Sequence, residues 1–295
     1  MTLAFDQLKP AEKQYYLQHA VAPRPIGFVS SIDQEGNMNL SPFSFFNLFS
    51  SNPPILVFSP SLRVRDNSSK HTLQNVLSVP EVVIHVVTYD MVQQMSLSSC
   101  EFPKGVNEFI KAGFTEEKAT LVKPSMVKES LIKMECKVLE VKALGTGGGA
   151  GNLVICEVLC MHIDDSLLDE NKKVDQRKIN HVARLGGDWY CVVNESNLFQ
   201  VEKPNTQLGI GVDQLPAAIR NSTVLTGNNL GQLGNVHDYP VIDPSFELSE
   251  LKQIIQYYSV SPAEMEKECH LLAKKLLDEG RVKDAWQVLL TSTEG

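Results

Sequence analysis

Residues 25–36 read Pro-Ile-Gly-Phe-Val-Ser-Ser-Ile-Asp-Gln-Glu-Gly, a β-type run that ends in turn residues and predicts a strand entering a hairpin. Outward from this stretch, short β-type runs alternate with turn residues as far as about residue 200. We expect further strands at residues 55–58, 82–87, 131–143, 153–163 and 182–193, the last interrupted by Gly186-Gly187. Helical stretches are expected only at residues 67–77 and 106–112. This pattern favours a mainly β fold, a closed or split antiparallel barrel, over a doubly wound parallel sheet.

After about residue 200 the apolar periodicity becomes helical. Ser261-Pro262-Ala263-Glu264 offers an N-cap, a first-turn proline and the acidic position of a capping box, and Gly280 offers a C-terminal stop. One face of the helix between them carries Met265, Cys269, Leu272 and Leu276. Helices are also expected at residues 249–258 and 282–290. We therefore expect two parts: residues 1–200 as the barrel, and residues 201–295 as a strap and helical extension packed on the barrel or on a dimer partner.

Composition and charge exclude several classes of protein. The 295 residues are 43% hydrophobic and 21% charged, which is ordinary for a folded domain and excludes disorder. The net charge of −8 argues against nucleic acid as the main partner, because binding to a phosphate backbone needs clustered cations. Residues 1–200 carry 19 Lys+Arg and 22 Asp+Glu, whereas residues 201–295 carry 8 and 13. The net charge is therefore −3 for residues 1–200 and −5 for residues 201–295, so more than half of the net negative charge lies in the last third of the chain.

The cysteines and the N-terminus predict a cytoplasmic protein with reduced thiols. Six cysteines form no tight framework, and the first residues lack a basic-then-apolar signal pattern. Cys156 and Cys160, the only close pair, lie in an expected strand where residues i and i+4 share one face. Core packing is therefore favoured over a metal site there, and no metal is expected.

Gly145-Thr-Gly-Gly-Gly-Ala-Gly151 fits a loose dinucleotide-binding pattern. That pattern works only when a helix follows it, because the helix N-terminus holds the pyrophosphate. A strand-like run follows here instead. The glycines are therefore interpreted as a flexible hairpin link between the strands at residues 131–143 and 153–163.

Residues 36–62 contain no charged side chain. Prolines and polar residues interrupt the run, so it does not predict a membrane span, and no membrane partner is expected. Five of the twelve phenylalanines nevertheless lie in it, interleaved with Ser and Asn. Flat apolar surface beside hydroxyl and amide groups suits a planar, heteroatom-rich ring. The alternative is a buried loop at a dimer interface, and the two interpretations are compatible.

Positive charge returns directly after this run, in Ser59-Pro-Ser-Leu-Arg-Val-Arg-Asp-Asn-Ser-Ser-Lys-His-Thr72. Arg63, Arg65 and Lys70 stand among hydroxyl side chains and close to an expected helix start. Cations, hydroxyls and helix N–H groups are what a phosphate monoester requires. The alternative is a solvated basic loop without a ligand.

Several stretches together resemble the flavin-reductase-like FMN-binding split-barrel proteins, flavoredoxin among them. The matching stretches are Arg24-Pro-Ile-Gly-Phe-Val-Ser-Ser-Ile-Asp33, Asn39-Leu-Ser-Pro-Phe-Ser-Phe-Phe-Asn47, Arg65, Ser69-Lys-His-Thr72 with Asn75, residues 102–115, Met134-Glu-Cys-Lys137, and Arg184-Leu-Gly-Gly-Asp-Trp-Tyr190. The resemblance covers about residues 20–195. Lys70-His71-Thr72 departs from the family's usual Lys-Asp-Thr.

The resemblance implies a homodimer of Greek-key split barrels with FMN at or near the subunit boundary. The residues that would line the isoalloxazine ring and ribityl chain are Ser41, Pro42, Phe43, Ser44, Phe45, Phe46 and Asn47. The residues that would hold the phosphate are Ser59, Arg65, Lys70 and Thr72, with His71 either contributing or only occupying the place of the usual Asp. Arg184 and Tyr190 would be the catalytic residues, approaching the flavin or the nicotinamide. Their alternatives are a structural ion pair for Arg184 and a plain sheet position for Tyr190.

The resulting hypothesis is a flavin reductase that moves a hydride from NADH or NADPH to flavin N5 and passes electrons to an acceptor, for which another protein is one candidate. The cofactor supplies the chemistry in such a reaction, and the protein supplies orientation and donors near the ring. One alternative is an FMN-binding electron carrier without nicotinamide turnover of its own. Another is a split barrel that binds no cofactor and serves as an interaction protein.

Overall fold

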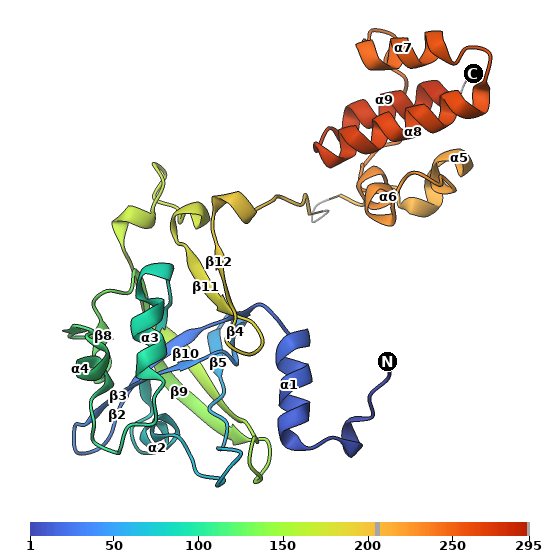
Figure 1. Ribbon diagram of the computed structural model, residues 1–295. Helices are drawn as coiled ribbons and strands as arrows, with labels where there is room; N and C mark the ends of the chain where they lie inside the picture. The colour runs from blue at the N-terminus through green and yellow to red at the C-terminus, as the bar shows by residue number, and fades with distance from the viewer. Residues whose placement is uncertain (204–206, 294–295) are drawn as a thin grey trace. The chain divides into compact units, whose positions relative to one another are not determined.

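The computed structural model describes residues 1–203 and 207–293, which form two compact units, Met1–Phe199 and Gln200–Gly295. The first unit is built on β-sheet and the second on helices (Figure 1). The predicted class, mainly β with a helical C-terminal extension, is confirmed.

One seven-stranded antiparallel sheet forms most of the first unit. Its strands, in spatial order, are β3 (Met38–Phe43), β2 (Gly27–Ile32), β6 (Glu81–Val86), β9 (Ile132–Ala143), β10 (Asn152–Ile163), β5 (Pro54–Phe58) and β4 (Phe46–Ser51). β9 and β10 are the long central pair in Figure 1. Alternation directs Met134, Cys136 and Val138 of β9 into a core that also contains Phe58 and Ile84. Burying each large apolar side chain there contributes about 1.5–3 kcal/mol to stability.

The sheet curls until its far edge approaches β2. β4 ends the sheet and pairs with β5, whereas β2 is the second strand from the opposite edge. The two strands meet through a side chain, because a Cβ at Gly27 would lie only 2.8 Å from Cγ of Phe46. Glycine is thus required at position 27 for the Phe46 ring to pack against the backbone of β2.

A smaller sheet and several helices surround the large sheet. The three-stranded sheet is β1 (Arg24–Pro25), β11 (His181–Arg184) and β12 (Tyr190–Val193), and a two-stranded ribbon is β7 (Glu116–Glu117) with β8 (Met126–Val127). The helices are α1 (Pro10–Ala20), α2 (His71–Ser78), α3 (Val92–Ser98) and α4 (Glu108–Ala112). The single strand expected at residues 182–193 is two strands joined by a turn at Gly186-Gly187, and the helix expected from residue 67 begins at His71. α1 was not predicted, and it has no buried residue that could give it an apolar period.

A β-bulge in β10 changes which way its cysteines face. Val158 lies opposite Cys136, but Cys160 lies opposite Glu135, so the bulge adds one residue to β10 between them. Cys156 consequently packs in the core, and Cys160 lies half-buried on the other face of the sheet. The prediction that Cys156 and Cys160 share one face was wrong, because the inserted residue breaks the period of two.

The second unit is a helical bundle with a core of its own. Its helices are α5 (Ala217–Arg220), α6 (Gly227–Gly234), α7 (Ser249–Tyr257), α8 (Pro262–Asp278) and α9 (Val282–Thr293). Cys269, Leu272 and Leu276 of α8 are buried and Met265 packs beside them, which confirms the predicted apolar face. Gly280 follows α8 with φ 76°, as a helix stop requires. The predicted capping box is absent, because the Ser261 side chain makes no capping hydrogen bond to α8.

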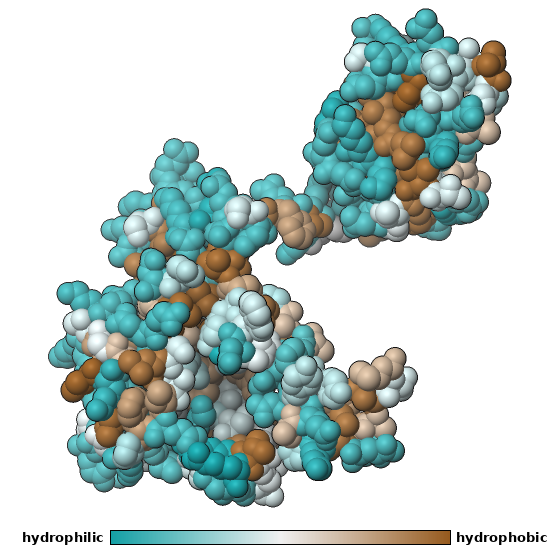
Figure 2. All heavy atoms as spheres, in the orientation of Figure 1, coloured by the Kyte–Doolittle hydropathy of each residue, from teal (hydrophilic) through white to brown (hydrophobic). Residues whose placement is uncertain are grey.

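On the face drawn in Figure 2, the surfaces of both units are mostly hydrophilic, with apolar residues gathered in separate patches. None of the helices in the described residues combines the length and apolar character needed to cross a membrane.

Candidate functional site

The predicted flavin-lining run divides into buried and accessible side chains. Phe43 is buried, and its ring packs on Phe58 with centroids 5.1 Å apart. The half-buried members of the run are Ser41, Pro42, Ser44 and Phe46, and the exposed members are Phe45 and Asn47. The run ends β3 at Phe43, turns at Ser44 and Phe45, and begins β4 at Phe46, and both exposed members lie after the end of β3. The run therefore forms part of the core on one side and an accessible polar and aromatic surface on the other.

The two arginines of the basic loop are paired with an acidic residue from a distant part of the chain. Arg63 Nε donates to Glu101 Oε1 at 2.8 Å, and Arg65 forms an ion pair with the other oxygen of Glu101. Arg63 Nη1 also donates to Ser68 Oγ and to the carbonyl of Ser69, both at 2.9 Å. The hydrogen bond from Arg63, followed by that from Arg65, holds the pKa of Glu101 below its usual range. Glu101 thus offsets much of the positive charge that the sequence shows in this loop.

Lys70 differs from both arginines. It stands at the residue before α2, half-buried, with Nζ 5.2 Å from the centroid of the Phe43 ring. Within the described residues its ammonium group makes neither a hydrogen bond nor an ion pair. Burial, and secondarily the charge of Arg63, lower the pKa of Lys70. The N–H groups of His71 and Thr72, the first of α2, are likewise without hydrogen-bond acceptors among the described residues, so a cation and two helix N–H groups stand together.

The Thr72 side chain takes part in a buried network. Its hydroxyl donates to Asn39 Oδ1 at 2.6 Å, and Asn39 Nδ2 donates to Glu108 Oε1 at 3.0 Å. The N–H of Leu40 donates to the other Glu108 oxygen at 3.0 Å. Burial raises the pKa of Glu108 despite these hydrogen bonds. The network fixes the start of α2 against β3 and α4.

His71 lies half-buried beside a small cavity that Lys104 and Asn75 also line. Burial, followed by the charges of Arg63 and Lys104, lowers the pKa of His71. The neutral imidazole is therefore favoured at neutral pH. The positive charges of Arg63 and Lys104 thus act on the His71 imidazole.

Ser59 lies beneath the glycine-rich link. The link joins β9 to β10, so its predicted role as a hairpin connection is confirmed. A Cβ at Gly151 would lie 2.7 Å from Ser59 Oγ, and one at Gly148 would lie 2.9 Å from the carbonyl oxygen of Val64. The glycines let the link pack closely on the basic loop.

Arg184 and Tyr190 face each other across the β11–β12 hairpin. The guanidinium carbon of Arg184 lies 4.4 Å from the centroid of the Tyr190 ring, and its nitrogens donate to Tyr190 Oη and to the carbonyl of Gly187. Arg24 lies opposite Arg184 in the neighbouring strand β1 and donates to the carbonyl of Leu185 at 2.8 Å. Burial, and then the charge of Arg184, lower the pKa of Arg24. Two cationic side chains thus stand side by side in this small sheet.

A cavity of about 250 Å³ lies between α3 and this hairpin. Tyr190 contributes to its lining together with Tyr89, Gln93 and Val182. Among the described residues, no hydrogen bond or ring contact joins Arg184 or Tyr190 to the basic loop. The predicted site residues therefore fall into two groups, one around the start of α2 and one on the β11–β12 hairpin.

Sequence reasoning missed Glu101, which controls the charge of the first group. Nothing in the local pattern marks this residue, because its two arginine partners lie 36 and 38 positions away. It also missed Arg24 as the neighbour of Arg184, since only the strand register brings the two together.

Comparison with known proteins places these features in a family. The sequence model described as the flavin reductase like domain matches residues 19–178. An uncharacterized protein of Aquifex aeolicus (strain VF5) is 39% identical over 170 residues, covering 58% of this chain and 84% of the relative. An uncharacterized protein of Halalkalibacterium halodurans is 34% identical over 206 residues, covering 69% of this chain and 97% of the relative. The crystal structure of nitrilotriacetate monooxygenase component B from Bacillus cereus is similar with a TM-score of 0.64 at 25% identity, covering 68% of this chain and 98% of that one.

Proposed function

Since the chain belongs to the flavin reductase-like domain family, we propose that it binds FMN and acts as an NAD(P)H-dependent flavin oxidoreductase. It has the split-barrel fold that its motifs predict. In this proposal the barrel unit binds FMN, NADH or NADPH is the co-substrate, and electrons pass to an acceptor such as another protein. The FMN and nicotinamide sites, the acceptor and the homodimer all belong to the proposal.

The observation that carries the proposal is that the ammonium group of Lys70 and the neighbouring N–H groups of His71 and Thr72 have no hydrogen-bond acceptor within residues 1–203 and 207–293. A half-buried cation loses hydration without a compensating ion pair, so an anionic ligand there gains more than it would from an exposed lysine. A phosphate monoester accepts hydrogen bonds from all three groups and carries the complementary charge. The donors present therefore fit the phosphate of FMN.

The remaining predicted residues have different roles in this arrangement. Ser59 and Arg65 stand in the same loop region, with Arg65 already paired to Asp66 and Glu101. The Phe43 ring lies against the Lys70 ammonium group. Thr72 contributes its N–H, while its hydroxyl donates a hydrogen bond to Asn39. The accessible side of the run, from Ser41 to Asn47, is the proposed surface for the isoalloxazine ring and ribityl chain.

FMN, when bound, supplies hydride-accepting chemistry at flavin N5. Arg184 is proposed to place its positive charge where negative charge develops on the ring, held in position by Tyr190 and Gly187. Tyr190 also lines the neighbouring cavity, which offers a mostly apolar space beside the hairpin.

The proposed homodimer is supported by the edge strand β4. Leu48 and Phe49 expose 61% and 67% of their surface there, next to the exposed Phe45. An apolar edge strand is usually covered in a native assembly, because an open edge promotes unspecific pairing. Light scattering coupled to size-exclusion chromatography should give twice the chain mass, and Phe49→Glu should shift the particle toward the monomer.

The visible spectrum of the purified protein tests the proposal against its alternatives. We expect a flavin spectrum, as isolated or after reconstitution with FMN, that bleaches on anaerobic stopped-flow mixing with NADH or NADPH. A bound flavin that neither nicotinamide bleaches would favour the electron carrier without turnover. A colourless chain that FMN cannot reconstitute would rule out both flavin functions and leave the interaction protein.

A further inference from the structure

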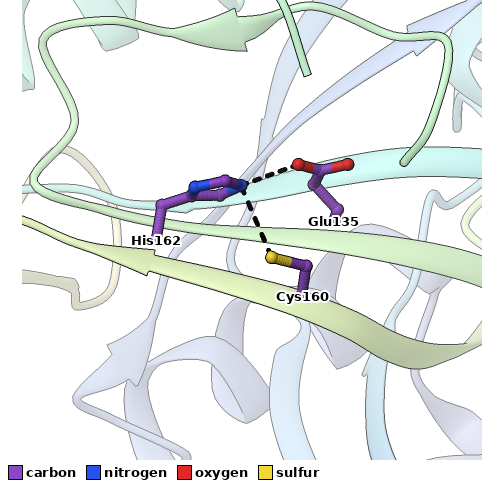
Figure 3. A group of neighbouring side chains, drawn as sticks. All are labelled: Glu135, Cys160 and His162. Atoms are coloured by element: carbon purple, nitrogen blue, oxygen red, sulfur yellow. Dashed lines mark hydrogen bonds and ion pairs between the residues drawn. The ribbon is translucent and has the colours of Figure 1, made fainter. Parts of the chain in front are cut away.

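Three potential metal ligands meet on the face of the central strand pair opposite the core residues Cys136 and Cys156. Glu135 comes from β9, and Cys160 and His162 come from β10 (Figure 3). His162 Nε2 lies 2.7 Å from Glu135 Oε1 and 3.7 Å from Cys160 Sγ. One ligand atom from each of the three residues lies within 4.8 Å of the other two.

The bulge in β10 creates this group. Without the extra residue, Cys160 would face the core on the same side as Cys156, and Glu135 would have no sulfur opposite it. The expectation of no metal here rested on that regular period. Because the bulge breaks this period, that argument against metal binding no longer applies to Cys160, whereas Cys156 packs in the core.

Backbone N–H groups hold the Glu135 carboxylate in place. It is fully buried, and it accepts hydrogen bonds from the N–H groups of Thr120 at 2.9 Å, Leu121 at 2.6 Å and Val122 at 3.1 Å. Burial opposes the charged form, but these bonds together with His162 outweigh it and lower the pKa of Glu135. A carboxylate has about four acceptor sites, and three are used by the backbone. The fourth, on Oε1, is directed at His162.

We propose that Glu135, Cys160 and His162 form a binding site for a divalent transition metal of the zinc class. The metal would take the place of the proton between His162 Nε2 and Glu135 Oε1, with the Cys160 thiolate as third ligand. A carboxylate oxygen, an imidazole nitrogen and a thiolate are all zinc ligands, and three protein ligands leave a fourth position for water. On binding, the Cys160 thiol proton leaves to solvent, the proton of the neutral His162 ring resides on Nδ1 so that Nε2 can bind the metal, and no electron is transferred.

The surroundings favour this exchange. Glu135 cannot move, but His162 and Cys160 can adjust, since 31% of the His162 side chain is exposed and Cys160 is half-buried. Tetrahedral zinc with bonds of about 2.0–2.3 Å keeps its ligand atoms roughly 3.3–3.7 Å apart, so His162 must withdraw slightly from Glu135. The neighbouring cation Lys133 is already paired with Glu117. The three backbone N–H groups act as the outer support that orients a metal-bound carboxylate.

The test uses the full-length protein, freed of metal with a chelator and studied with Zn²⁺ by calorimetry and with Co²⁺ by absorption spectroscopy. We expect one Zn²⁺ per chain. The Co²⁺ form should show a sulfur-to-metal charge-transfer band and d–d bands of a four-coordinate site, the latter beyond the absorption of any bound flavin. Cys160→Ser should abolish the charge-transfer band, and His162→Gln should weaken Zn²⁺ at least about 10-fold, the lower limit for loss of a supporting group alone.

Controls separate ligand loss from unfolding and from other thiols. Cys100 is an exposed free cysteine, so Cys100→Ser should bind metal like the wild type. Zn²⁺ should raise the melting temperature of the wild type and of Cys100→Ser but not of Cys160→Ser. The proposal is overturned if Cys160→Ser and the wild type, both folded by circular dichroism, bind Zn²⁺ equally, or if the wild-type Co²⁺ spectrum lacks the thiolate band.

Discussion

The two cationic regions of the barrel unit both place positive charge beside an aromatic ring, but they differ in what satisfies that charge. On the β11–β12 hairpin, Arg184 lies over Tyr190 and donates to it and to a backbone carbonyl of the same turn. At the start of α2, Lys70 lies over Phe43 and has no hydrogen-bond acceptor among the described residues. Arg184 is thus held by acceptors of its own hairpin, whereas the ammonium group of Lys70 has none in the part of the chain that the structure describes. The proposed phosphate position therefore rests on the charge without an acceptor and not on the number of cations.

The strongest way to break this comparison is to remove the unsatisfied charge. Lys70→Ala should weaken FMN roughly 10- to 100-fold, the range for losing a hydrogen bond to a charged group, and should leave riboflavin binding unchanged because riboflavin has no phosphate. Fluorescence titration with both ligands measures the difference.

Lys111 is a matched control for Lys70, because its Nζ also lies over a phenylalanine, 5.8 Å from the Phe102 centroid. Lys111→Ala should bind FMN like the wild type. Equal losses of FMN and riboflavin in Lys70→Ala would show that the phosphate is bound elsewhere.

Removing the satisfied cation should change rate and not affinity. Arg184→Ala is expected to slow flavin reduction by NADH or NADPH about 10-fold, less than loss of a fully enclosed charge-stabilising donor, because Arg184 is only half-buried. FMN affinity should stay within about twofold. Anaerobic stopped-flow gives the rate, and Tyr190→Phe, which retains the ring and loses only the hydroxyl, should have a smaller effect. A large loss of FMN affinity without a rate effect would instead place the phosphate at the hairpin.

Raising the pH should remove the charge of Lys70 without a mutation. Burial lowers the pKa of Lys70 from 10.5, so its ammonium group loses its proton at a lower pH than that of an ordinary lysine. FMN affinity should therefore fall as the pH rises, and at a lower pH than the titration of an ordinary lysine would give, whereas riboflavin affinity should stay level. Lys70→Ala should remove this difference between the two ligands. An equal pH dependence for both would point to a group other than Lys70.

The smallest expected effect comes from unpairing the arginines. Glu101→Gln removes the carboxylate that pairs Arg63 and Arg65, so more positive charge faces the Lys70 region. FMN should bind about twofold more tightly, since exposed ion pairs contribute little, and the gain should disappear in high salt. Glu117→Gln, which breaks the ion pair with Lys133 elsewhere in the barrel unit, is the matched control. Weaker FMN binding in Glu101→Gln would mean that Glu101 acts by positioning Arg63.

Much of the fold was accessible from the sequence because strands and helices leave local periodic signals. The hairpin at residues 25–36, the long pair β9 and β10, and the apolar face of α8 were all predicted. α1 was missed because it buries no residue and therefore has no apolar stripe. The bulge in β10 was missed because one inserted residue depends on the pairing with β9, and periodicity within one strand does not record its partner.

The candidate site was predictable in its residue types but not in its charge balance. The basic stretch at residues 59–72 and the uncharged, phenylalanine-rich run at residues 36–62 both depart from average composition. Glu101, from a distant part of the chain, pairs with Arg63 and Arg65 and so decides which cation has no acceptor among the described residues. The buried position of the Thr72 hydroxyl depends likewise on Asn39 and Glu108. Such contacts arise from the tertiary fold and leave no trace in local spacing.

The contact between Phe46 and Gly27 has a consequence for how the barrel opens. There the curled sheet is closed by a ring against a backbone, whereas β6 and β9 are bonded to a neighbouring strand on both sides. Separating the Phe46 seam breaks van der Waals contacts and no ladder of hydrogen bonds, so it is the least costly place for a partial opening. Amide protons of β4 should consequently exchange with deuterium well before those of β6 and β9. The native protein would thus open first at the contact between Phe46 and Gly27. A ligand bound against Phe46 would slow the exchange of the β4 amide protons.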